Sequence, residues 1–152
     1  MILGDYLLNL LKILIHLNLK DMGMKDNEFS CPECSGHLNI GGKIVFATQT
    51  KRKHKGLIMM SPTVGEYNYI HHDKFHLEKG ELVDFECPIC QTDLTSEVNE
   101  EHAMVYMIAA EDNMEYELYF SKIAGQQSTY VVAHDNVESF GEDAIDFETL
   151  YE

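Results

Sequence analysis

The chain has 152 residues, of which 45% are hydrophobic and 24% are charged, with a formal net charge of −15. This length suits one domain, or one domain with an appendage, and lets a hydrophobic core form without covalent staples. The composition therefore excludes a small scaffold that depends on disulfides for its stability, and the four cysteines need another explanation.

The first twenty residues, "MILGDYLLNLLKILIHLNLK", are strongly apolar. They lack a basic leading region and a small-residue cleavage site, and the apolar run is interrupted by Asp5, Asn9, Lys12 and His16. The segment is therefore a poor signal peptide and a poor transmembrane helix. We expect a cytoplasmic protein with reduced thiols, and no membrane partner unless these residues are native.

Two interpretations of this N-terminal segment remain open. Its polar residues, continued to Lys20, fall at helical spacing, which predicts an amphipathic helix that needs a partner, a membrane surface or the protein's own core. The alternative is translated upstream sequence, because Met22 and Met24 both precede the polar stretch "KDNEFS". On that view residues 1–24 are an extension that the folded protein does not need.

Beyond the extension, alternating and β-branched segments predict strands. The first group covers 43–50, 56–61, 66–72 and 81–86, with Pro62 and Gly80 in the connecting turns. A second group covers 103–109, 115–121 and 129–133, separated by turn residues. In 115–121, Tyr116, Leu118 and Phe120 alternate with Glu115, Glu117 and Tyr119, as expected of a strand with one buried face. We therefore predict a mainly β fold that ends in an antiparallel meander.

Charge is distributed unevenly along the chain. Residues 87–152 contain fifteen acidic residues and a single basic one, Lys122. A basic cluster, Lys51, Arg52, Lys53, His54 and Lys55, lies between the strands predicted at 43–50 and 56–61 and is thus expected at a hairpin tip. The acidic end, "GEDAIDFETLYE", is expected to be solvated or loosely docked.

The four cysteines occur in two copies of one motif, "FSCPECSGHL" at 29–38 and "FECPICQTDL" at 85–94. A Cys-x-x-Cys turn presents two thiolates from one tight loop, and two such loops supply the four sulfurs that tetrahedral zinc prefers in structural sites. We predict that one Zn²⁺ is bound by Cys31, Cys34, Cys87 and Cys90. The 52 residues between Cys34 and Cys87 exceed the usual interval of about 15–20, so they must form a folded insert.

Three other uses of these residues were weighed. Cys-Pro-x-Cys also occurs in thiol–disulfide proteins, where a helix normally follows the first thiolate, but neither motif here opens a convincing helix. A rubredoxin-like iron site uses the same four ligands, but in that resemblance Gly follows the second Cys, where this chain has Ser35 and Gln91. The third use involves histidine, either His37 in place of a cysteine or a second metal or acid–base site formed by His71, His72, Asp73 and His76.

The paired Cys-Pro-x-Cys knuckles joined by strands resemble the zinc-ribbon proteins. The layout is most similar to small bacterial zinc-ribbon proteins of uncharacterised function, in which the second knuckle is followed by a strand run such as "EYELYFSKIAGQQSTYVV" and an acidic "ESFGED" ending. The resemblance covers about residues 25–145. It implies zinc and a β-rich fold, and it implies no reaction.

These observations favour a non-catalytic, zinc-stabilised binding module over a thiol-redox or metal-dependent enzyme. Its expected parts are the extension 1–24, a zinc-ribbon-like domain 25–97 with a long β-hairpin insert, a meander 98–140 packed on it, and an acidic tail 141–152. The expected partner is a protein or nucleic acid of the transcription or translation machinery, contacted through Lys51, Arg52, Lys53 and Lys55. No motif for a small-molecule substrate is evident.

Overall fold

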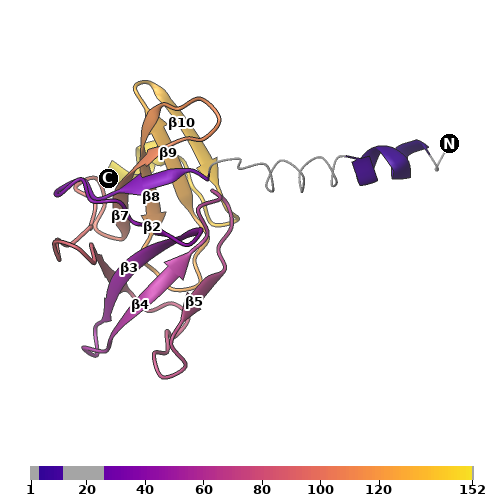
Figure 1. Cartoon of the computed structure of the whole chain (residues 1–152). Helices are drawn as coiled ribbons and strands as arrows, with labels where there is room; N and C mark the ends of the chain where they lie inside the picture. The colour runs from indigo at the N-terminus through magenta and orange to yellow at the C-terminus, as the bar shows by residue number, and fades with distance from the viewer. Residues whose placement is uncertain (1–3, 12–25, 152) are drawn as a thin grey trace.

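The computed structural model describes residues 4–11 and 26–151. The described part is mainly β and contains two antiparallel sheets (Figure 1). One sheet, called here the insert sheet, has the order β2-β3-β4-β5, and β6 also pairs with β3. Its strands are β2 (Asn39–Ile40), β3 (Lys43–Thr50), β4 (Lys55–Met60), β5 (Tyr69–His71) and β6 (Val83–Glu86).

The other sheet, called the meander sheet, has the order β1-β7-β8-β9-β10. Its strands are β1 (Glu28–Ser30), β7 (His102–Ile108), β8 (Glu115–Ser121), β9 (Thr129–Ala133) and β10 (Asn136–Phe140). The predicted fold class is therefore confirmed: the protein is mainly β, the two Cys-x-x-Cys pairs are separated by a β insert, and an antiparallel meander follows.

Strand register shows that the chain repeats one structural unit. In each half a short strand leads into a knuckle, and a hairpin and a further strand follow: β1, β3, β4 and β5 in the first half, and β6, β7, β8 and β9 in the second. The short strands are exchanged between halves, because Phe29 of β1 pairs with Met107 of β7 while Phe85 of β6 pairs with Thr48 of β3. The two halves therefore complete each other's sheets.

The core lies between the sheets and draws on both halves. Three rings meet at its centre: Phe46 of β3 lies 5.5 Å from Phe85 of β6 and 5.3 Å from Phe120 of β8, and Phe85 and Phe120 pack edge to face with centroids 5.0 Å apart. Such pairs contribute about 0.5–1.5 kcal/mol each beyond the burial of their area. The inner faces of both sheets thus form one hydrophobic cluster.

The acidic C-terminal segment differs from the expected solvated end. Phe147 and Leu150 are buried, and they belong to a short 3₁₀ helix, η1 (Phe147–Tyr151). Phe147 packs against Tyr119 and Tyr130 on the outer face of the meander sheet, with ring centroids 5.5 and 5.3 Å apart. The prediction that β8 has one buried face is therefore wrong at Tyr119, because two apolar residues spaced through the acidic tail cover it.

Most predicted strands are confirmed within one or two residues of their ends. The prediction at 66–72 is too long, since β5 is limited to Tyr69–His71, and three short strands, β1, β2 and β10, were not predicted. Short strands carry too few residues for a period-two pattern to stand out. β1 is fixed instead by long-range pairing with β7, whereas β10 is the second strand of a tight hairpin with β9.

Of the N-terminal extension, the structure describes residues 4–11, which form a helix with exposed side chains, Tyr6, Leu7 and Leu8 among them. The remainder of the predicted amphipathic helix and the methionines at 22 and 24 lie outside the described residues. Within the described ranges, no helix is long and apolar enough to cross a membrane.

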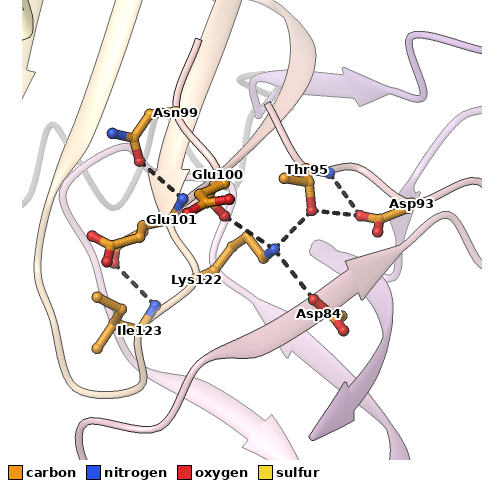
Figure 2. Close-up of polar contacts among 9 residues, drawn as sticks. Asp84, Asp93, Thr95, Asn99, Glu100, Glu101, Lys122 and Ile123 are labelled. Atoms are coloured by element: carbon orange, nitrogen blue, oxygen red, sulfur yellow. Dashed lines mark hydrogen bonds and ion pairs between the residues drawn. The ribbon is translucent and has the colours of Figure 1, made fainter. Parts of the chain in front are cut away.

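A buried lysine joins the two sheets next to the second knuckle. Lys122 is only 4% exposed, and its Nζ lies 3.2 Å from Asp84 Oδ1, 2.7 Å from Thr95 Oγ1 and 3.2 Å from the carbonyl of Glu100 (Figure 2). Its main chain accepts a hydrogen bond from Val83 of β6 and donates one to the carbonyl of Glu101. A buried charge persists only when its hydrogen-bonding capacity is met, and here three oxygens surround it.

We predict that Asp84→Asn lowers the free energy of unfolding by about 1–2 kcal/mol, measured by urea denaturation. The change leaves the buried Lys122 ammonium without its counter-charge. The loss is smaller than the about 3–5 kcal/mol of a fully buried pair, because the Asp84 side chain is 49% exposed. Glu86→Gln, two residues along the same strand, is the matched control and should change stability by less than about 0.5 kcal/mol. Equal losses in both variants would contradict this role for Asp84.

Candidate metal centre

The structure brings all four predicted cysteines together. Their Sγ atoms all lie within 4.8 Å of one another. Two sulfur pairs cross between the knuckles: Cys31 to Cys90 is 3.8 Å, and Cys34 to Cys87 is 3.9 Å. Cys31 and Cys87 are buried, whereas Cys34 and Cys90 are exposed.

These distances fit a tetrahedral metal ion. Four sulfurs placed about 2.3 Å from a central zinc are separated by about 3.8 Å, because the edge of a tetrahedron is about 1.63 times its centre-to-corner distance. The two short distances match this spacing, and no pair of sulfurs is close enough to be a disulfide. The four-cysteine group could therefore hold one metal ion.

Both knuckles have the same backbone. The N–H of Ser35 donates to the carbonyl of Cys31 at 2.9 Å, and the N–H of Gln91 donates to that of Cys87 at 2.9 Å. Ser35 and Gln91 both have the positive φ values, 61° and 66°, at which glycine is normally preferred. The conserved shape of the two turns explains why the sequence motif is repeated, since each must direct two sulfurs to one point.

Hydrogen bonds from the main chain surround the sulfurs. The N–H of Glu33 donates to Cys31 Sγ at 3.4 Å, that of Gly36 to Cys34 Sγ at 3.3 Å, and that of Ile89 to Cys87 Sγ at 3.3 Å. Donors placed around sulfur stabilise the thiolate form that binds metals and fix its orientation. The turns are thus shaped to present thiolates.

The two knuckles differ in the residue two positions after the second cysteine. Thr92 takes the place of Gly36 in the second knuckle, and a 3.2 Å hydrogen bond joins its hydroxyl to Cys90 Sγ. This hydroxyl is the main cause that lowers the pKa of Cys90 to about 6. In contrast, burial raises the pKa of the Cys31 thiol to about 12, so Cys31 needs a nearby cation to become a thiolate near neutral pH. Cys90 is therefore deprotonated more readily than Cys31.

The knuckles also pack against each other. A Cβ atom at Gly36 would lie 2.5 Å from Cδ1 of Ile89 and 3.2 Å from the sulfur of Cys34. Glycine at this position lets the apolar side chain of the second knuckle lie over the first. The approach of the two turns is thus set by a side-chain contact as well as by the sulfurs.

The basic cluster lies where it was predicted, in the turn between β3 and β4, and all five of its residues are exposed. Arg52 differs from the lysines because its guanidinium is 3.2 Å from Glu78 Oε1 and 3.3 Å from Glu81 Oε2. Within the described ranges, no carboxylate forms an ion pair with Lys51, Lys53 or Lys55. Of the four residues predicted to contact an anion, the three lysines are thus better placed to do so than Arg52.

The histidines of "YIHHDKFH" do not join the metal centre. Nδ1 of His71 bonds to the carbonyl of His72 at 2.9 Å, and Nδ1 of His72 accepts the N–H of Lys74 at 3.0 Å. In the described ranges, the four cysteines are the one group of three or more His, Cys, Asp or Glu residues with ligand atoms close enough for an ion. Neither His37 nor the set His71, His72 and His76 provides a second such group.

Sequence reasoning missed a buried polar network around His102. Nδ1 of His102 lies 3.2 Å from Asn99 Oδ1, its Nε2 lies 3.4 Å from Ser128 Oγ, and burial lowers its pKa. Asn99 also donates to the carbonyl of Leu150, which holds the C-terminal turn. A single histidine at the start of a strand gives no signal of this role, because Ser128 and the C-terminal turn that complete the network lie far along the chain.

Comparison of the chain with protein-family models, with curated proteins and with solved structures finds no match. The metal centre therefore has to be interpreted from its own geometry.

We predict that Thr92→Val weakens metal binding by about 10-fold or more, measured by competition with a chromophoric chelator. The change keeps the size of the side chain but removes the hydroxyl that stabilises the Cys90 thiolate. Thr92→Ser is the matched control, since it retains the hydroxyl and should bind within about threefold of the wild type. Equal affinity in all three proteins would show that the hydroxyl does not tune the site.

Proposed function

We propose that the protein is a non-catalytic binding module whose fold is stabilised by one structural zinc ion. The observation that carries this proposal is the sulfur geometry: four thiols from two turns lie at tetrahedral spacing and leave no ligand position open. A closed four-sulfur site suits a structural ion, whereas a catalytic zinc keeps a position for water or substrate.

Two features favour a metal over a thiol–disulfide centre. In a Cys-x-x-Cys redox site the reacting sulfurs belong to one motif, but here sulfurs of different motifs lie 3.8 and 3.9 Å apart. Each turn also leads into extended chain: the first into β2 (Asn39–Ile40), and the second into the bridge between Thr95 and Ala103. Neither turn leads into a helix, whose N-terminus would stabilise a reactive thiolate. Zinc is preferred to iron because Ser35 and Gln91 stand where rubredoxin-like iron sites have Gly after the second Cys, and colour distinguishes the two.

Purified under reducing conditions, the protein should contain one zinc per chain by elemental analysis and be colourless. Cys34→Ser and Cys87→Ser should lose the metal and most of the cooperative unfolding transition, because metal binding at such a site is folding free energy. Ser35→Ala, a neighbouring change that removes no ligand, should keep both. A red protein with stoichiometric iron, or cysteine variants as stable as the wild type, would contradict the zinc assignment.

For the partner, we propose a polyanion, with RNA or DNA as the leading candidate and a protein of the transcription or translation machinery as the alternative. Support comes from Lys51, Lys53 and Lys55 at the tip of the β3–β4 hairpin. Beside the tip lies a shallow surface pocket lined by Gly56, Phe75 and four basic side chains. These four are His54, Lys55, His72 and Lys74. Clustered cations of this kind neutralise phosphates and release their counterions.

The test compares wild type with a triple variant in which Lys51, Lys53 and Lys55 are changed to Ala. Binding to a fluorescent RNA or DNA duplex is measured over a range of salt concentrations. If the hairpin is the contact, the slope of log affinity against log salt falls by up to about three units, since each phosphate contact contributes about 0.7–0.9. Lys43→Ala with Lys79→Ala is the control that removes charge elsewhere. If the wild type binds neither nucleic acid at low salt, the partner is a protein.

A further inference from the structure

An apolar cavity of about 170 Å³ lies between the two sheets. Its walls come from both halves of the repeat, and no cysteine lines it. Related positions of the two halves both line it: Phe29 and Phe85, Ile58 and Leu118, Met60 and Phe120. Its rim is formed by the loops that follow β4 and β8, which are also related by the repeat.

Polar groups at the rim are already paired within the protein. Ser61 donates to Glu66 at 2.6 Å, and Ser121 donates to Gln126. The hydroxyl of Tyr67 lies 3.0 Å from Thr129 Oγ1 and donates to the carbonyl of Phe140. Among the described residues, no buried side-chain nitrogen or oxygen lacks a partner. A molecule in the cavity would therefore meet mainly apolar side chains, and these rim hydroxyls are already engaged.

Water is a poor occupant of such a space. A buried water is retained by about two to four hydrogen bonds, and the rim hydroxyls of Ser61, Tyr67 and Ser121 are already paired within the protein. Left empty, the cavity would deprive its walls of dispersion contacts that the close packing of protein interiors normally supplies. A cavity of about 150 Å³ lined by Leu, Ile and Phe stays dry and binds benzene, so the present volume holds one aromatic ring or an alkyl group of that size.

We propose that this cavity is a binding site for a small apolar molecule, whose buried part is a single aromatic ring or an alkyl group of similar volume. The ligand enters between the β4–β5 and β8–β9 loops. Specificity comes mainly from volume and shape, because most of the wall is apolar. This site is separate from the metal centre and does not depend on the function proposed for the basic hairpin.

The test uses benzene as the probe and the full-length, metal-loaded protein. Methyl NMR should show saturable shifts at Ile58 and Leu118, which line the cavity, and none at Ile89 on the knuckle. Ala124→Leu, at a small residue of the wall, should weaken benzene binding at least tenfold. Ala109→Leu is the matched control, because Ala109 packs on the same core but does not line the cavity; its affinity should stay within threefold of the wild type.

Two outcomes would overturn the proposal: no saturable shift in the wild type, or benzene binding by Ala124→Leu as tight as in Ala109→Leu. Metal content and the methyl spectrum establish that each variant is folded. A second measurement needs no variant: under xenon pressure, the wild type should bind xenon next to Phe46, Ile58 and Leu118. Finding ordered water there instead, by contacts to these side chains in NMR, would also overturn the proposal.

Discussion

The exchange of short strands between the two halves is the constraint on which the rest of the structure depends. β1 completes the sheet of the second half, and β6 pairs with β3 of the first, so neither half satisfies its own backbone hydrogen bonds alone. These pairings join residues far apart in sequence, and the entropy of closing such long loops must be recovered from contacts formed late in folding. The cysteine cluster sits at the ends of the same two strands, since Cys31 follows β1 and Cys87 follows β6. One ion bound there would hold the exchanged strands at the point where both leave the sheets.

The sequence predicts most of the fold because its long strands have a clear two-residue period and one inward face. The knuckles are equally recognisable, since four sulfurs in two identical turns have few other uses. Predictions fail where the determining contact is remote. The tail is acidic on average, but its Phe147 and Leu150 pack on Tyr119 and Tyr130. The average composition of the segment does not reveal these two apolar residues as core residues. The strand exchange, the His102 network and the cavity likewise depend on which segments meet, and a local pattern contains no record of that.

Backbone strain in the knuckles indicates how the site is maintained. Ser35 and Gln91 adopt positive φ, a conformation that costs an ordinary residue about 1 kcal/mol or more. Glycine would remove this cost, but it would also make each turn freer in the unfolded chain. The turn hydrogen bonds to the carbonyls of Cys31 and Cys87 hold both residues in place. Stability of the turns and placement of the sulfurs are therefore coupled, so loss of one sulfur disturbs more than a single ligand.

The repeat is symmetric in shape but not in charge. The β3–β4 hairpin ends in Lys51–Lys55, whereas the related β7–β8 hairpin ends in a turn containing Glu111 and Asp112. A rotation that superimposes the two halves would exchange a positive tip for a negative one. The molecule consequently has a built-in electrical polarity. A charged surface approaching from a distance would rotate the protein before any contact forms. The two hairpin tips, although nearly equivalent in backbone shape, would therefore contact that surface with very unequal frequency.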